Sequence, residues 1–277
     1  MDKNINDILE YLQKFNGFNY SAYHIGMLER RIKNRIVKTN TDNVHNYYSF
    51  LTTIPDEPKR LTENFMINVS NFFRDPLCFE LLARIFIPDL VKEKQKLNDD
   101  TLRVWSAGCS HGEEAYSLAI LINEFREHEK LDLNLDLFAT DYDEKAIESA
   151  QNGTYSPGSM KEVKLGLVEK YFVVKDGKYT VIPELKSMVH FSVYDLLQKN
   201  SHAPSESIFG DFDLILCRNV LIYFNLDFQE QIINRLHKSL AANGILVLGE
   251  SEVLLPRHTD KFRPQSTYCK FFKKTGS

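Results

Sequence analysis

The chain has 277 residues, of which 43% are hydrophobic and 26% charged, the composition of an ordinary globular protein with one or two domains. Its formal net charge of −4 gives no general attraction to nucleic acid or anionic membranes, so neither is expected as a partner. The four cysteines form no C-x-x-C pair, and we predict neither a metal site nor a disulfide framework. Without a signal-peptide pattern or a membrane-length apolar run, we expect a cytoplasmic protein with no direct membrane insertion.

The first seventy residues show helical periodicity and no strand pattern. Apolar residues at helical spacing open the chain, at Ile5, Ile8, Leu9 and Leu12. Ser21 is expected to cap a second helix that runs to about Lys38. Two shorter helices are predicted over residues 44–51 and 58–66. We therefore predict a small all-helical domain over residues 1–70.

The second predicted helix, about residues 21–38, is strongly basic. An apolar stripe that includes Leu28 and Ile32 is expected to face the core, which sends the cations to the other faces. Such a helix is either a solvated face whose long stems cover apolar surface or a docking surface for an acidic partner. Clustering of this strength in an acidic chain favours docking. The predicted docking residues are Arg30, Arg31, Lys33, Arg35 and Lys38.

Residues 68–74, NVSNFFR, form a polar and then aromatic junction. Asp75 and Pro76 follow as a predicted N-cap and first helical residue of a helix to about Lys96. Asn68, Ser70 and Arg74 are hydrogen-bonding groups in an apolar setting. They either line a site or cap helices and close a domain interface.

The rest of the chain is organised around residues 102–117, LRVWSAGCSHGEEAYS. This stretch predicts a short strand, a turn of small residues and a helix, with Gly108 and Gly112 allowing a ligand to approach the backbone. It contains neither a P-loop Lys-Ser/Thr pair nor a G-x-G-x-x-G motif. Glu113 and Glu114 in the first helical turn would repel a pyrophosphate but suit the sulfonium and ribose of S-adenosylmethionine. The alternative is a plain strand-to-helix turn with acidic residues that favour the helix dipole.

The next predicted strand alternates through Leu131–Leu137 and ends at Asp141. An acidic residue at the end of the second strand of a doubly wound sheet commonly binds a ribose hydroxyl. Asp141 is therefore a candidate ribose ligand, with a helix N-cap as the alternative. For Asp143 the N-cap is the favoured interpretation.

Residues 155–190 interrupt the α/β rhythm. Asp176 and Gly177 lie between two β-rich runs, a pattern typical of an antiparallel hairpin inserted into the parallel core. A strand ending near Asp195 and a buried strand ending at Arg218 and Asn219 then resume the rhythm. The fold class predicted for residues 71–277 is α/β, a doubly wound Rossmann-like domain with an antiparallel β-hairpin insertion at about residues 155–190.

Four motifs, NVSNFFR, RVWSAGCSHGEEAYS, ATDYDEKAI and CRNVLIYF, resemble in order and spacing the chemotaxis-receptor methyltransferase family, CheR. The helical domain and the hairpin insertion match this family as well. The resemblance implies a protein-glutamate O-methyltransferase that uses S-adenosylmethionine and yields S-adenosylhomocysteine. Its expected protein substrate is the cytoplasmic helical bundle of a chemoreceptor, whose glutamates become γ-methyl esters, and a monomer is expected.

The resemblance also implies a set of site residues. Cofactor contacts are expected from Asn68, Ser70, Arg74, Gly108, Glu114, Asp141, Asp195, Leu196, Arg218 and Asn219. Ser70 stands where the family often has Thr, and Asp195 where Asn is frequent. The insertion can hold a receptor's C-terminal peptide in this family, but the short hairpin with a plain Asp-Gly turn argues against tethering here.

The implied chemistry needs no strong base, because a glutamate carboxylate is ionised at neutral pH. We expect Arg74 and Tyr223 to orient the incoming carboxylate as the catalytic residues. A methyltransferase acting on another protein or RNA remains an alternative, as does a non-catalytic cofactor-binding signalling module.

Overall fold

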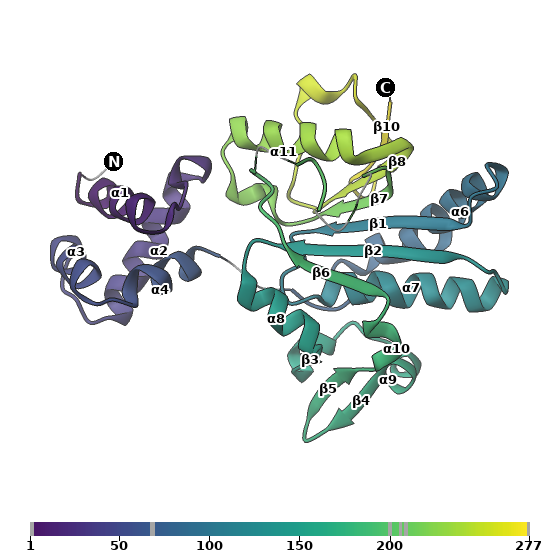
Figure 1. The fold of residues 1–277 in the computed structure, drawn as a ribbon, viewed down its shortest axis with the longest axis horizontal. Coiled ribbons are helices and arrows are strands. Elements are labelled where there is room, and N and C mark those ends of the chain that lie inside the picture. The colour runs from purple at the N-terminus through teal and green to yellow at the C-terminus, as the bar shows by residue number, and fades with distance from the viewer. Residues whose placement is uncertain (1–2, 67–69, 199–200, 205–206, 208–209, 276–277) are drawn as a thin grey trace. The chain divides into compact units, whose positions relative to one another are not determined.

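The computed structural model describes residues 3–66, 70–198, 201–204, 207 and 210–275 (Figure 1). The chain divides into two compact units. The smaller comprises Met1–Ile67 together with Ile222–Gln229, and the larger comprises Asn68–Leu221 and Glu230–Ser277. Residues 222–229 are predicted to belong to the second domain, whereas their contacts place them in the smaller unit.

The smaller unit is helical, and its core is built from the apolar stripes of its helices. Ile8, Leu12, Leu28, Leu51 and Leu61 are fully buried in this core. The helices are α1 (Lys3–Asn16), α2 (Ile25–Lys38), α3 (Val44–Thr53) and α4 (Glu57–Phe65), with the short 3₁₀ turn η1 (Tyr20–Ala22) before α2.

Helix α2 begins later than the sequence suggested. Ser21 lies in η1, and the residue at the N-cap position of α2 is His24. Tyr23 is extended and forms an antiparallel bridge with Phe224, and the two rings stack with centroids 5.0 Å apart. Because Tyr23 is used in this bridge, the helix cannot start before it, and the predicted Ser21 cap is wrong.

The larger unit is built on a seven-stranded sheet in the order β6-β2-β1-β7-β8-β10-β9. Its first five strands are parallel, whereas β10 runs antiparallel to both β8 and β9. The strands are β1 (Thr101–Ala107), β2 (Asn134–Asp141), β6 (Val189–Val193), β7 (Phe212–Cys217), β8 (Leu240–Leu248), β9 (Phe262–Pro264) and β10 (Phe271–Lys274). The predicted doubly wound α/β class is confirmed, and the strand order reverses beside β1, where such folds bind ligands.

Helices flank this sheet. Helix α6 packs on β1, α7 on β2 and β6, and α8 on β2 and β6, as the arrangement around the sheet in Figure 1 shows. Pro76–Lys96 is a continuous helical run that contains a π-helical segment, η2. The elements are α5 (Pro76–Leu81), η2 (Leu82–Phe86), α6 (Ile87–Lys96), α7 (Glu113–Glu129), α8 (Glu144–Asn152), α11 (Leu226–Ser239), and the short turns η4 (Leu221–Tyr223) and η5 (Pro256–His258). Among the described residues, no helix has the length and apolar character needed to cross a bilayer.

The predicted insertion is a separate antiparallel sheet in the order β3-β5-β4. Asp176 and Gly177 both have positive φ, the conformation of a two-residue hairpin turn, so the predicted hairpin is confirmed. The third strand, β3, is not predicted by the hairpin pattern. The elements are β3 (Thr154–Tyr155), η3 (Pro157–Met160), α9 (Leu165–Tyr171), β4 (Phe172–Lys175), β5 (Lys178–Val181) and α10 (Pro183–Lys186).

Candidate functional site

The turn after β1 is held tightly against the turn after β2. The backbone N–H groups of Gly108 and Cys109 both donate to the carbonyl of Thr140, at 2.7 and 2.9 Å. Gly108 has a φ of 82°, and a Cβ there would collide with Val220. Both the conformation and the close approach require glycine at this position.

Asp141, at the end of β2, faces this turn. Its carboxylate accepts hydrogen bonds from the backbone N–H of Ser110 at 2.8 Å and of Asp143 at 3.0 Å. Burial raises the pKa of the Asp141 carboxyl, and these N–H donors oppose the rise. Each carboxylate oxygen has further lone-pair capacity, so Asp141 can still accept from a ligand hydroxyl. Asp143 accepts from Lys145 N–H at 3.0 Å, which confirms its predicted N-cap role.

Arg218, which follows β7, is the centre of a buried charge network. Its side chain is only 2% exposed, and Nη1 donates to Glu114 Oε2 at 3.0 Å. Nη2 donates to the carbonyl of Arg74 at 3.0 Å and to the carboxylate of Asp75. Glu114 also accepts from the Ser106 hydroxyl at 2.8 Å. The buried Arg218 side chain therefore links the segment after β7 to residues 74–75 and to Glu114.

Asp75 differs from its predicted role. It occupies the N-cap position of α5, but its φ is 61° and its side chain makes no capping hydrogen bond. The carboxylate is turned to Arg218 instead, because a buried guanidinium requires compensating charge. The sequence signal was limited to the Asp-Pro pair, which indicates a helix start and nothing about a partner 143 residues away.

The segment that carries Ser70 and Arg74 is anchored by its aromatic residues. The N–H of Phe72 donates to the Ser159 carbonyl at 3.1 Å, and that of Phe73 to the Ser117 hydroxyl at 2.9 Å. The fully buried Phe72 ring packs edge-on against Tyr155 and Phe172. Phe73 has a φ of 52°, a strained conformation of the kind found at functional sites. Ser70 and Arg74 are half-buried, and Asn68 lies outside the described residues.

Asp195 and Leu196 follow β6, the neighbour of β2 in the sheet. The Asp195 carboxylate accepts from the Leu197 N–H at 2.8 Å, and Leu196 is buried. Tyr142, which the sequence analysis did not single out, is 45% exposed. Burial raises the pKa of its hydroxyl, and the charge of Asp195 adds to the rise. An exposed aromatic ring beside Asp141 offers an apolar face at this edge of the sheet.

Tyr223 lies in residues 222–229, the segment that belongs to the smaller, helical unit. It is half-buried, and its carbonyl accepts from the N–H of His24 at 3.0 Å. Arg74 belongs to the larger unit. The structure therefore assigns the two predicted catalytic residues to different units.

The predicted docking helix, α2, divides into exposed and buried cations. Arg30, Lys33 and Lys38 are exposed, and Arg31 is half-buried. Arg35 is 8% exposed and forms two 2.6 Å hydrogen bonds to the buried carboxylate of Glu57. Arg35 falls on the apolar stripe, three residues after Ile32, and cannot contact a partner. Its predicted docking role is wrong.

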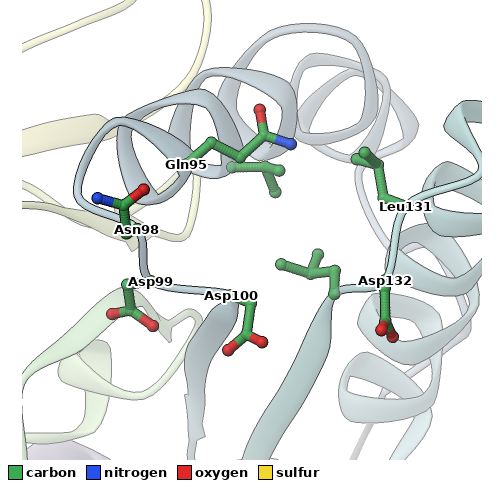
Figure 2. A pocket seen from close by; sticks show the side chains of 8 residues that line it. Gln95, Asn98, Asp99, Asp100, Leu131 and Asp132 are labelled. Carbon is green, nitrogen blue, oxygen red and sulfur yellow. The ribbon is translucent and has the colours of Figure 1, made fainter.

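A cavity of about 330 Å³ lies at the opposite edge of the sheet, before the amino ends of β1 and β2 (Figure 2). Figure 2 shows Asp99, Asp100 and Asp132 around it. Asp99 forms an ion pair with Lys94 at 2.5 Å. Among the described residues no group of three His, Cys, Asp or Glu side chains is arranged to hold a metal ion. Ligands of open α/β sheets bind beyond the carboxyl ends of the strands, so this cavity is not the candidate site.

Two family patterns match the chain. Residues 3–66 match the all-alpha domain of CheR methyltransferases, and residues 68–270 match their SAM-binding domain. A chemotaxis protein methyltransferase of Borreliella burgdorferi is 28% identical over 257 residues, which cover 92% of this chain and 89% of the relative. Chemotaxis protein methyltransferase 1 of Pseudomonas aeruginosa is 36% identical over 197 residues, 69% of each chain. An uncharacterised 104.1 kDa protein of Rhodobacter capsulatus is 35% identical over 253 residues, and the chain spans 26% of its length.

Proposed function

The chain belongs to the CheR family of S-adenosylmethionine-dependent chemotaxis methyltransferases, and from this premise we propose that it methylates glutamate side chains of a chemoreceptor. The products are a glutamate γ-methyl ester and S-adenosylhomocysteine. The observation that carries this proposal is the match of both family patterns, in order, over residues 3–66 and 68–270. The proposed partner is the cytoplasmic helical bundle of the receptor, and the proposed setting is the cytoplasm.

The residues at the carboxyl edge of the sheet fit S-adenosylmethionine. Asp141 keeps acceptor capacity for ribose hydroxyls, and polar groups are added by Asp195, after β6 beside β2, and by Asn219, after β7 on the far side of β1. The turn after β1 lacks the lysine that a phosphate-binding loop needs, and acidic residues border it. We propose that Ser70, Arg74, Gly108 and Leu196 complete the cofactor site, together with Asn68 from outside the described residues. Glu114 and Arg218 contribute by holding the edge of the site in place.

When bound, S-adenosylmethionine supplies an electrophilic sulfonium methyl group, which an ionised carboxylate can accept without a general base. The task left to the protein is orientation at near-attack distance. Arg74 can offer a bidentate fork to the substrate carboxylate, and Tyr223 one hydroxyl. Arg218 fixes the backbone of Arg74 through its carbonyl, which supports an orienting role for the Arg74 side chain.

We propose that the exposed cations of α2 dock the receptor. At about 100° per residue, Arg30 lies between Lys33 and Lys38, which are about 140° apart, so the three cations spread across a broad exposed face of the helix. Arg31 borders this face. Exposed ion pairs are worth only about 0.2–1 kcal/mol each, so the attraction to a glutamate-rich bundle is shared among several contacts and weakens as salt rises.

Methyl transfer from tritiated S-adenosylmethionine to a purified receptor cytoplasmic domain tests the proposed function. We expect a label on the receptor that is released as methanol by mild base, because the product is an ester. A label on RNA, or a base-stable label on protein, would contradict the proposal. Binding of S-adenosylhomocysteine without any transfer to receptor would favour the signalling-module alternative.

Replacing Asp141 by alanine is expected to weaken S-adenosylhomocysteine binding by about 1.5–3 kcal/mol, the worth of hydrogen bonds to a charged acceptor. Titration calorimetry measures this loss directly. Asp143→Ala is the matched control, since it removes the N-cap of α8 at a cost of about 0.5–2 kcal/mol in stability and should leave the affinity unchanged. Equal affinity of folded Asp141→Ala and wild type would remove Asp141 from the site.

A further inference from the structure

Glu252, in the turn after β8, accepts four backbone hydrogen bonds although it is only 2% exposed. Its Oε2 accepts from Gly249 N–H at 2.6 Å and from Asn219 N–H at 3.0 Å. Its Oε1 accepts from Leu221 N–H at 2.7 Å and from Val220 N–H at 2.8 Å. Every oxygen of this buried carboxylate is thus bonded twice, which leaves no acceptor site for a ligand.

Three of the four donors are consecutive residues of one loop, residues 219–221, which leads from β7 into η4. Three successive amides pointing at one anion form a nest, an arrangement that fixes the path of the backbone. Asn219 has a φ of 60°, in the left-handed region that asparagine tolerates better than most residues other than glycine. Without the carboxylate, these three N–H groups would lose the acceptor that they share.

This loop is part of the wall of the proposed cofactor site. Asn219 is one of the proposed cofactor residues, and Arg218 directly before it holds Arg74 and Glu114. Val220 packs against Gly108 in the turn after β1, so the loops of β1 and β7 meet where the strand order reverses.

The turn that carries Glu252 also contacts Asn219 directly, through Gly249. A Cβ at Gly249 would lie 2.8 Å from the backbone nitrogen of Asn219 and 3.0 Å from its side-chain Nδ2. The backbone of Gly249 therefore lies directly against Asn219, at a distance that leaves no room for any other residue.

We infer that Glu252 is a positioning residue for cofactor binding: it sets the 218–221 loop, and with it the side chain of Asn219, without touching the cofactor. This inference rests on the proposed location of the S-adenosylmethionine site. It assigns a role to a residue outside the four motifs that carry the family resemblance.

The test is Glu252→Gln, which keeps the shape of the side chain but replaces one acceptor oxygen with an NH₂ group that faces backbone N–H donors. We expect the Kd for S-adenosylhomocysteine to rise at least about tenfold, the effect of losing one charge-assisted hydrogen bond in the wall of the site. The KM for S-adenosylmethionine should rise in parallel, whereas the KM for the receptor should stay within about twofold. Glu250→Gln, at an exposed position two residues earlier, is the matched control and should behave as wild type.

A purely structural role would lower the melting temperature of Glu252→Gln and leave both KM values of the folded protein at the wild-type level, which would overturn the inference. If Glu252→Gln does not fold, Gly249→Ala takes its place, because a Cβ there would crowd both Asn219 and Glu252 Oε2 without removing the charge of the carboxylate. Wild-type affinity of Gly249→Ala would then overturn it. Failure of wild type itself to bind S-adenosylhomocysteine would contradict the proposed function instead, so the two failures are distinguishable.

Discussion

Replacing Arg35 by glutamate is expected to unfold the smaller unit or to destabilise it by about 3–5 kcal/mol, the cost of breaking a buried ion pair from one side. Both oxygens of Glu57 accept from Arg35 at 2.6 Å, and the Tyr47 hydroxyl donates to Glu57 at 2.8 Å. A glutamate at position 35 would put two carboxylates together in a site that excludes water. Hydrogen exchange of α2 and α4 in the full chain measures the loss.

Arg30→Glu is the matched control on the same helix. Arg30 is exposed, so its replacement should change the free energy of unfolding by no more than about 0.5 kcal/mol. The folded control also reports on docking, since the KM for the receptor should rise while S-adenosylhomocysteine affinity stays unchanged. If Arg35→Glu were as stable as Arg30→Glu, the buried network would not hold the helices together.

Replacing Arg74 by alanine is expected to lower kcat for methyl transfer by about 100-fold or more, the effect of losing orientation at the reacting atoms. Tyr223→Phe, which removes only a hydroxyl, should lower kcat by roughly tenfold, in line with one hydrogen bond. In both variants the Kd for S-adenosylhomocysteine should change less than kcat. Single-turnover transfer and calorimetry separate the two quantities.

The controls for these variants are an arginine and a tyrosine on the surface. Arg84 pairs with Glu80 on an exposed helix face, and Tyr268 is 81% exposed, so Arg84→Ala and Tyr268→Phe should transfer methyl groups at the wild-type rate. Arg74→Lys is informative as well, because it keeps the charge but loses the bidentate fork. Wild-type rates in both Arg74→Ala and Tyr223→Phe would end the orienting hypothesis.

Local patterns predicted what depends on neighbours in sequence. The strand, turn and helix around Gly108, the hairpin at Asp176 and Gly177, and the cap at Asp143 all follow from backbone rules that act within a few residues. The fold class followed from the alternation of such elements.

Local patterns could not predict which charged side chains pair with residues far away in the sequence. Arg35 has the residue type of a surface helix, and only Glu57 on another helix makes its burial possible. Asp75 has the sequence pattern of a helix cap, but its carboxylate pairs with Arg218. Nothing near Glu252 in the sequence indicates that its carboxylate binds a loop 33 residues earlier. Each of these charged groups is explained by a partner that the fold alone brings close.

The return of residues 222–229 to the smaller unit also has a consequence for synthesis of the chain. The helices α1 to α4 are complete by Phe65, but Phe224, whose ring covers Tyr23, is made roughly 160 residues later. At about 5–20 residues per second, the ribosome leaves this unit unfinished for roughly 10–30 s. During that interval the bridge between Tyr23 and Phe224 cannot form, so the smaller unit is completed only after residues 222–229 have been synthesised.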